Sequence, residues 1–125
     1  MGTDPIFLIK ENMDDTIAKV LKFRDERDWK QFHDPKSLAA SISIEAAELL
    51  ELFQWLAPDE ARRQAVEKRE RVSEEIADVA IYLIELADVA GIDLAAAIEA
   101  KLEKNALKYP VEKSRGAWTK YTDLK

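Results

Sequence analysis

The sequence of 125 residues contains no cysteine, only three glycines and only four prolines. Without cysteine the chain has no disulfide, no thiolate nucleophile and no cysteine-ligated zinc site. The scarcity of glycine and proline, together with 47% hydrophobic and 35% charged residues, is typical of helix-rich globular proteins. No alternating strand pattern and no repeat period are present. We therefore expect an all-α protein.

Long apolar runs and an excess of basic charge are also lacking. No apolar stretch approaches the roughly 20 residues that span a bilayer, and the N-terminus does not resemble a signal peptide. We therefore expect a cytoplasmic protein that does not bind membranes. The net charge of -6 disfavours a nucleic-acid polymer as partner, because such partners require a basic face. A small anionic ligand is still compatible, since a bound divalent cation can invert the local charge.

Helical periodicity predicts four helices, over residues 15–27, 35–56, 58–90 and 93–108, with a potential break in the third near Ser73. Asp34 and Pro35 have the residue types expected at a helix start, and Gly91 is expected to end the third helix. These pieces suit a four- to five-helix bundle with short connections. Residues 13–125 are expected to form one domain. Residues 1–12 show no clear periodicity, and we expect an expression leader or a disordered segment there.

The most informative segment is SISIEAAELLELFQW, where carboxylates interrupt an apolar helix. At about 100° per residue, Glu45 falls within the apolar stripe, Glu48 lies about 60° from Glu45 and is also embedded among apolar residues, and Glu51 lies on the rim. The segment SEEIADVAIYLIELADV places Glu75 and Asp78 in the same way. Two helices thus carry carboxylate pairs three residues apart on otherwise apolar faces, and four carboxylates converge if these faces meet.

Four converging carboxylates require a compensating charge, because burial and mutual repulsion both disfavour their ionised forms. Neither apolar stripe contains a basic residue, and oxygen ligands suit Mg²⁺ or Mn²⁺. The plain alternative is that each pair is a solvated set of helix charges. A ferritin-type di-iron site is excluded, because the only histidine, His33, follows Lys30 rather than a glutamate at the required spacing. No EF-hand loop pattern occurs.

From about Phe23 to Leu124 the chain resembles the MazG-like all-α nucleoside triphosphate pyrophosphohydrolases, and among them the dCTP pyrophosphatase branch. The motifs that carry this resemblance are E-x-x-E at Glu45 and Glu48, E-x-x-D at Glu75 and Asp78, and the stretches ERDWKQFH, ELFQW, EEIADVAIYL, KYPVEKSRG and KYTDL. The resemblance implies a single helical pyrophosphohydrolase domain over residues 13–125. It also implies Mg²⁺-dependent hydrolysis of dCTP or related dNTPs to the monophosphate and pyrophosphate, as in nucleotide pool cleaning.

The resemblance also implies site residues. The expected metal ligands and catalytic residues are Glu45, Glu48, Glu75 and Asp78, with Mn²⁺ as a substitute for Mg²⁺ and Glu48 as a candidate base. The expected substrate-binding residues are Trp29, Lys30, Gln31, Phe32, His33, Trp55, Tyr82, Lys101, Asn105 and Lys108. Relatives carry a histidine where this chain has Val20, which leaves contacts from the first helix open.

Each of these roles has a structural alternative. A tryptophan in a helical protein commonly packs in the core, His33 could cap a helix, and Lys108 could belong to a solvated stripe. The resemblance implies a homotetramer built as a dimer of dimers, in line with helices that are apolar nearly all round. A different class of function is also open, namely a non-catalytic helical module whose acidic face binds a partner protein.

Overall fold

The computed structural model describes the backbone of residues 5–124 and the side chains of residues 13–124. Every regular element in this part of the chain is helical, which confirms the all-α class. The chain divides into one unit that ends at Gly91 and another that starts at Ile92. None of the described helices is long and apolar enough to cross a membrane.

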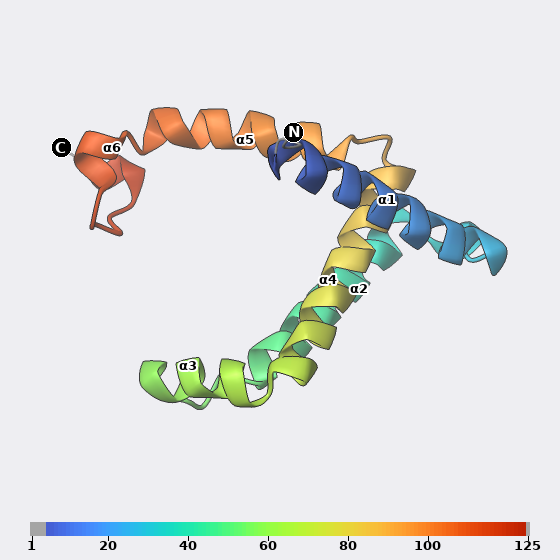
Figure 1. Cartoon of the computed structure of the whole chain (residues 1–125), viewed down its shortest axis with the longest axis horizontal. Helices are drawn as coiled ribbons and strands as arrows, with labels where there is room; N and C mark the ends of the chain where they lie inside the picture. The colour runs from blue at the N-terminus through green and yellow to red at the C-terminus, as the bar shows by residue number, and fades with distance from the viewer. Residues whose placement is uncertain (1–4, 125) are drawn as a thin grey trace. The chain divides into compact units, whose positions relative to one another are not determined.

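In the first unit, the other α-helices all contact α4 (Arg69–Val89). The elements of this unit are α1 (Pro5–Glu26), η1 (Lys30–Phe32), α2 (Pro35–Glu51), α3 (Pro58–Glu67) and α4. Helix α2 runs alongside α4 over most of its length, and α1 and α3 each contact α4 as well (Figure 1). The faces of α2 and α4 that carry the acidic motifs can therefore meet.

Side-chain caps fix where α2 and α3 begin. Asp34 accepts a hydrogen bond from the backbone N–H of Ser37 at 2.9 Å, and Pro35 occupies the first turn of α2. At the start of α3, Glu60 Oε1 accepts a hydrogen bond from the Ala57 N–H at 3.3 Å, beside Pro58. Both starts agree with the sequence-based prediction.

Three other boundaries differ from the prediction. Helix α1 begins at Pro5 rather than Asp15, and residues 1–4, which were part of the predicted leader, lie outside the described residues. Helix α2 ends at Glu51 rather than at Leu56. Ala57 is extended, as is common for a residue that precedes proline. The break between α3 and α4 lies at Lys68 rather than near Ser73. Charged helix formers surround this break, so periodicity did not locate it.

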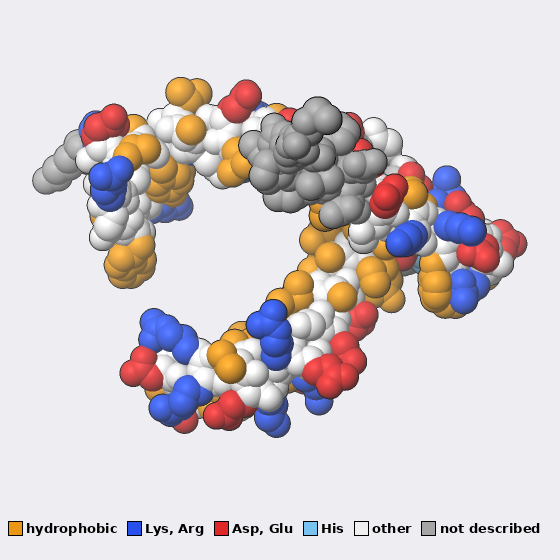
Figure 2. Space-filling model, in the orientation of Figure 1, with side chains coloured by type: hydrophobic (Ala, Val, Ile, Leu, Met, Phe, Trp, Pro, Cys, Tyr) orange, Lys and Arg blue, Asp and Glu red, His pale blue; other side chains and the backbone are white. Residues whose placement is uncertain are grey.

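The core of the first unit is small. Leu38 is its most deeply buried apolar side chain, and Ile84 and Ala87 are the other buried apolar residues among those described. Many large hydrophobic side chains are exposed, including Ile44, Leu50, Trp55, Val66, Ile76, Ile81 and Leu83. Figure 2 shows hydrophobic side chains along the visible face of the α2 and α4 pair. This amount of exposed apolar surface is unusual for a chain that acts alone.

The second unit contains α5 (Leu94–Lys108), the short α6 (Val111–Ser114) and η2 (Tyr121–Asp123). Asp93 caps α5 by accepting a hydrogen bond from the Ala96 N–H at 3.1 Å. The rings of Tyr109 and Tyr121 pack edge to face, with centroids 5.9 Å apart. A turn at Arg115 and Gly116 follows α6, and this glycine has a φ of 72°, in the left-handed region.

Candidate active site

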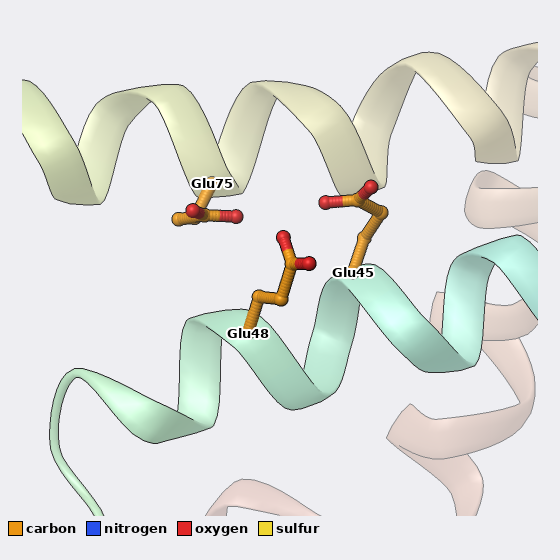
Figure 3. A group of neighbouring side chains, drawn as sticks. All are labelled: Glu45, Glu48 and Glu75. Atoms are coloured by element: carbon orange, nitrogen blue, oxygen red, sulfur yellow. The ribbon is translucent and has the colours of Figure 1, made fainter.

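Three glutamates from α2 and α4 face one another. Glu45 and Glu48 project from α2, and Glu75 projects toward them from α4 (Figure 3). Each offers a carboxylate oxygen, and these oxygens all lie within 4.8 Å of one another. The i, i+3 spacing on α2 places its two glutamates on one helical face, and the packing of α2 against α4 adds the third.

This cluster has the properties of an oxygen-ligand metal site. The Oε2 atoms of Glu45 and Glu75 are buried, and neither has a hydrogen-bond partner among the described residues. Burial raises the pKa of Glu45, and the neighbouring carboxylates of Glu48, Asp78 and Glu75 raise it further. Burial also raises the pKa of Glu75, as do the charges of Glu48 and Asp78, whereas Arg71 acts in the opposite direction. A divalent cation would satisfy the buried oxygens and remove this repulsion.

Asp78, the fourth predicted ligand, is not part of the tight group of three. It lies close enough for its charge to raise the pKa values of Glu45 and Glu75, and its side chain is exposed. It also lines a cavity of about 560 Å³. Asp78 therefore stands between the glutamate cluster and this cavity.

The cavity lies between α1, α4 and the segment that joins α1 to α2. Its lining is largely apolar and aromatic, and comprises Thr16, Lys19, Val20, Phe23, Trp29, His33, Asp78, Ile81, Tyr82 and Glu85. Three of the predicted substrate-binding residues, Trp29, His33 and Tyr82, are therefore brought together at one cavity. Burial raises the pKa of the Tyr82 phenol, and the charges of Glu45, Glu85 and Asp78 add to this effect.

Four other predicted substrate-binding residues do not line this cavity. Phe32 and Trp55 are exposed, and 87% of the Trp55 surface is accessible. Lys30 Nζ lies 3.9 Å from Asp88 Oδ2. The amide of Gln31 donates to Asp28, both to its backbone oxygen and to its carboxylate, at 3.0 Å each. Lys30 and Gln31 thus contact other residues of the protein rather than the cavity. Gln31 stabilises Asp28, whose φ is 54°.

The three predicted residues on α5 lie in the second unit. Lys101 lines a shallow depression with Ala97, Ile98 and Leu102. The backbone oxygen of Asn105 accepts a hydrogen bond from the Tyr109 N–H at 2.8 Å. Lys108 Nζ lies 4.8 Å from the centroid of the Tyr121 ring, at cation–π distance. Within the described residues Lys108 is therefore not simply part of a solvated stripe.

Sequence reasoning missed several residues that line the cavity. Lys19 and Phe23 come from α1, and Glu85 comes from α4. Glu85 carried a usable signal, because Glu75, Asp78, Tyr82 and Glu85 follow one another at spacings of three, four and three and so share one face of α4. Lys19 and Phe23 carried no comparable signal, since the pairing of α1 with α4 is a tertiary feature.

Comparison with known proteins agrees with this arrangement. Residues 40–124 match the MazG-like family model. Bovine dCTP pyrophosphatase 1 is 42% identical over 120 residues, which cover 94% of this chain and 71% of that protein. The rat dCTP pyrophosphatase 1 is 46% identical over 105 residues, which cover 82% of this chain and 62% of that protein.

A solved structure supports the same assignment. The crystal structure of a pyrophosphatase from Archaeoglobus fulgidus has a TM-score of 0.75 and 49% sequence identity to this chain. The match covers 79% of this chain and 93% of that one. The family match, the curated relatives and this structure together confirm the resemblance that the sequence motifs indicated. The chain belongs to the MazG-like family.

Proposed function

We propose that this protein hydrolyses deoxynucleoside triphosphates, with dCTP or a related dNTP as the preferred substrate, to the monophosphate and pyrophosphate. The observation that carries the proposal is the cluster of three glutamates next to a cavity with aromatic walls. Relatives that are dCTP pyrophosphatases support both the reaction and the base preference. The proposed role is removal of unwanted nucleotides from the cytoplasmic dNTP pool.

The family and the acidic cluster indicate that the enzyme uses a divalent metal. We propose Mg²⁺, which Mn²⁺ could replace, because the cluster offers only oxygen ligands. Glu45, Glu48 and Glu75 would hold it, with Asp78 as the fourth ligand. When bound, the metal supplies Lewis acidity toward the phosphates and lowers the pKa of the attacking water.

Individual residues of the protein then have separate proposed roles. Glu48 is the proposed base that accepts a proton from the attacking water. Trp29 stacks on the base, an interaction worth roughly 1–3 kcal/mol. Tyr82 packs against the sugar, where its ring would disfavour a 2′-hydroxyl. Lys101, Asn105 and Lys108 remain the proposed phosphate-binding residues of α5.

We also propose that the protein assembles as a homotetramer, a dimer of dimers. The exposed hydrophobic residues of α2 and α4 support this proposal, because the other described residues of the first unit do not cover them. Trp55 and Phe32, which do not line the cavity of their own chain, would then serve at the pocket of a second copy. Light scattering during gel filtration should give four times the mass of the 14.2 kDa chain. A monomer would remove the basis for placing Trp55 at a shared pocket.

The function is tested by incubating the protein with the four dNTPs, dUTP and the ribonucleotide CTP in the presence of Mg²⁺. We expect pyrophosphate and the monophosphate as products, fastest with dCTP and slowest with CTP. A chelator should abolish the reaction, and Mn²⁺ should restore it. Release of orthophosphate alone, or no turnover with any nucleotide, would contradict the proposal and favour a non-catalytic interaction module.

A further inference from the structure

A second polar cluster lies at the cavity, away from the three glutamates. Glu85 is ten residues beyond Glu75 on α4, which corresponds to roughly 15 Å along the helix. Its side chain is only 8% exposed, although it lines a cavity with apolar and aromatic walls. A carboxylate buried beside apolar walls needs a partner that compensates its lost hydration, or it has a function in ligand binding.

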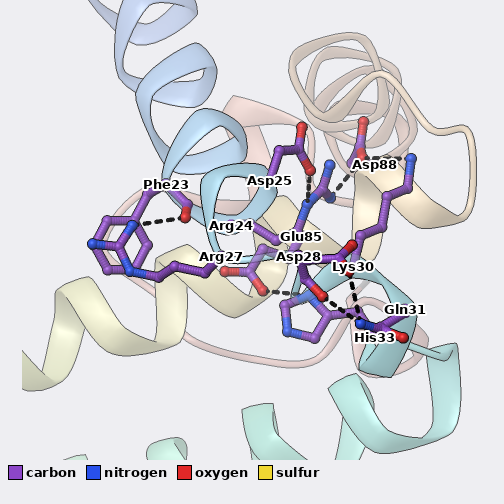
Figure 4. A network of polar contacts seen from close by, with 10 residues as sticks. All are labelled: Phe23, Arg24, Asp25, Arg27, Asp28, Lys30, Gln31, His33, Glu85 and Asp88. Carbon is purple, nitrogen blue, oxygen red and sulfur yellow. Dashed lines mark hydrogen bonds and ion pairs between the residues drawn. The ribbon is translucent and has the colours of Figure 1, made fainter.

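The neighbour of Glu85 at the cavity is His33. The Nδ1 atom of His33 lies 2.9 Å from Glu85 Oε2 (Figure 4). The two atoms are within ion-pair distance but are not aligned as a hydrogen bond, and both are buried without another hydrogen-bond partner among the described residues. This contact uses one carboxylate oxygen of Glu85 and holds its side chain at the wall of the cavity.

A network of buried polar groups lies close to Glu85. The guanidinium of Arg24 is almost completely buried, and it donates from Nη1 to Asp88 Oδ2 at 2.7 Å and from Nε to Asp25 Oδ1 at 2.9 Å (Figure 4). Burial raises the pKa of Glu85 above its ordinary value, and the charges of His33 and Arg24 oppose this effect only in part. An ionised carboxylate only accepts hydrogen bonds, so the cluster is suited to a ligand group that carries N–H.

The geometry of the site limits which part of a nucleotide reaches this cluster. If the phosphates lie against the glutamate cluster, as the proposed function has it, the base extends along α4 toward Glu85. Trp29 and Phe23 also line the cavity, and their rings pack edge to face with centroids 5.8 Å apart. Aromatic walls hold the faces of a base, which leaves its edge for the polar groups.

We propose that Glu85, positioned by His33, reads the base by accepting a hydrogen bond from the exocyclic amino group of cytosine. Carboxylates accept from this N4 amino group when proteins recognise cytosine in DNA. Uracil and thymine carry a carbonyl oxygen at the same position, which would face the carboxylate without a hydrogen. A site built to pair with a donor rejects an analogue that lacks it, because the buried acceptor is then unpaired. This inference rests on the proposed function and assigns its base preference to one residue.

The test compares dCTP with dUTP, which differ on the base edge but share the sugar and phosphates. In the wild type, kcat/KM for dCTP should exceed that for dUTP. Glu85→Gln introduces an amide that can donate to O4 of uracil, so the ratio of the two kcat/KM values should fall by about 10- to 100-fold. Activity toward dUTP should not fall in parallel with activity toward dCTP. Glu85→Asp retains the charge and should keep the preference for dCTP at a lower rate.

A merely structural role for Glu85 would instead lower both activities equally. Glu99→Gln, the same isosteric change at an exposed position of α5, is the matched control and should leave the ratio unchanged. Thermal melting of each variant identifies loss of folding. An unchanged ratio in folded Glu85→Gln, or equal use of dCTP and dUTP by the wild type, would overturn the inference. If no dNTP is hydrolysed, the proposed function fails, and thermal shifts of the wild type with dCTP and with dUTP then decide the inference separately.

Discussion

Glu75→Gln should lower the rate of pyrophosphate release by roughly 10²- to 10³-fold, as expected when one group that stabilises transition-state charge is lost. Glu75 is buried, and its carboxylate faces Glu45 and Glu48 across the contact between α2 and α4. The amide keeps the shape of the side chain but is a poor ligand for a hard cation, so both the metal and the phosphates would be held less well.

This substitution should not destabilise the helices. Removal of one carboxylate lowers the repulsion within the cluster, so the metal-free variant should melt at the wild-type temperature or above it. Steady-state kinetics with dCTP, at several Mg²⁺ concentrations, would separate loss of metal affinity from loss of turnover. The neighbouring Glu74→Gln is the matched control, because Glu74 is exposed on the same helix and should tolerate the change. A folded Glu75→Gln variant that retains the full rate would exclude the glutamate cluster as the reaction centre.

The metal-free protein should be more stable at pH 5 than at pH 7. The pKa values of Glu45 and Glu75 are raised in the folded state, chiefly by burial and then by neighbouring carboxylates. Above the ordinary glutamate pKa of about 4.3, the folded protein thus binds more protons than the unfolded chain, and the free energy of unfolding falls as pH rises. This contribution is present below the unfolded pKa and is lost as pH rises through the folded pKa of each group.

A divalent metal should reverse this dependence. It binds the deprotonated carboxylates, so its affinity and the stabilisation that it provides increase with pH. As pH increases from 5 to 7, the melting temperature should therefore fall by about a few degrees in the presence of chelator and rise in the presence of millimolar Mg²⁺. The double variant Glu45→Gln, Glu75→Gln should lose the rise with Mg²⁺ and show a smaller fall with chelator, because the pKa of Glu85 is also raised by burial and contributes the remainder.

The pH range separates the cluster from carboxylates whose pKa values are lowered. Hydrogen bonds with Arg24 lower the pKa of Asp25, and hydrogen bonds with Ser37 lower the pKa of Asp34, so these groups act at lower pH. Their stabilising contributions are present above the ordinary aspartate pKa of about 3.9 and are lost only as pH falls below it. If the melting temperature of the metal-free protein instead rises from pH 5 to pH 7, the glutamates do not lie as close together as they do in the structure.

Much of the fold followed from local rules. The caps at Asp34 and Asp93 and the proline at position 58 located three helix starts, because these residues satisfy or remove backbone donors in the first turn. The break at Lys68 did not follow from such rules. It separates two stretches that both favour helix, so the change of direction depends on how α3 and α4 contact each other.

The candidate site divides in the same way. Helical periodicity by itself determined that Glu45 and Glu48 share a face of one helix and that Glu75 and Asp78 share a face of another, because the angle per residue is a property of the backbone. It did not determine which helices touch. The packing of α2 on α4 brought three of these carboxylates together, and the approach of α1 to α4 built the cavity and placed His33 beside Glu85. Those contacts join residues far apart in the chain, and only side-chain packing in three dimensions decides them.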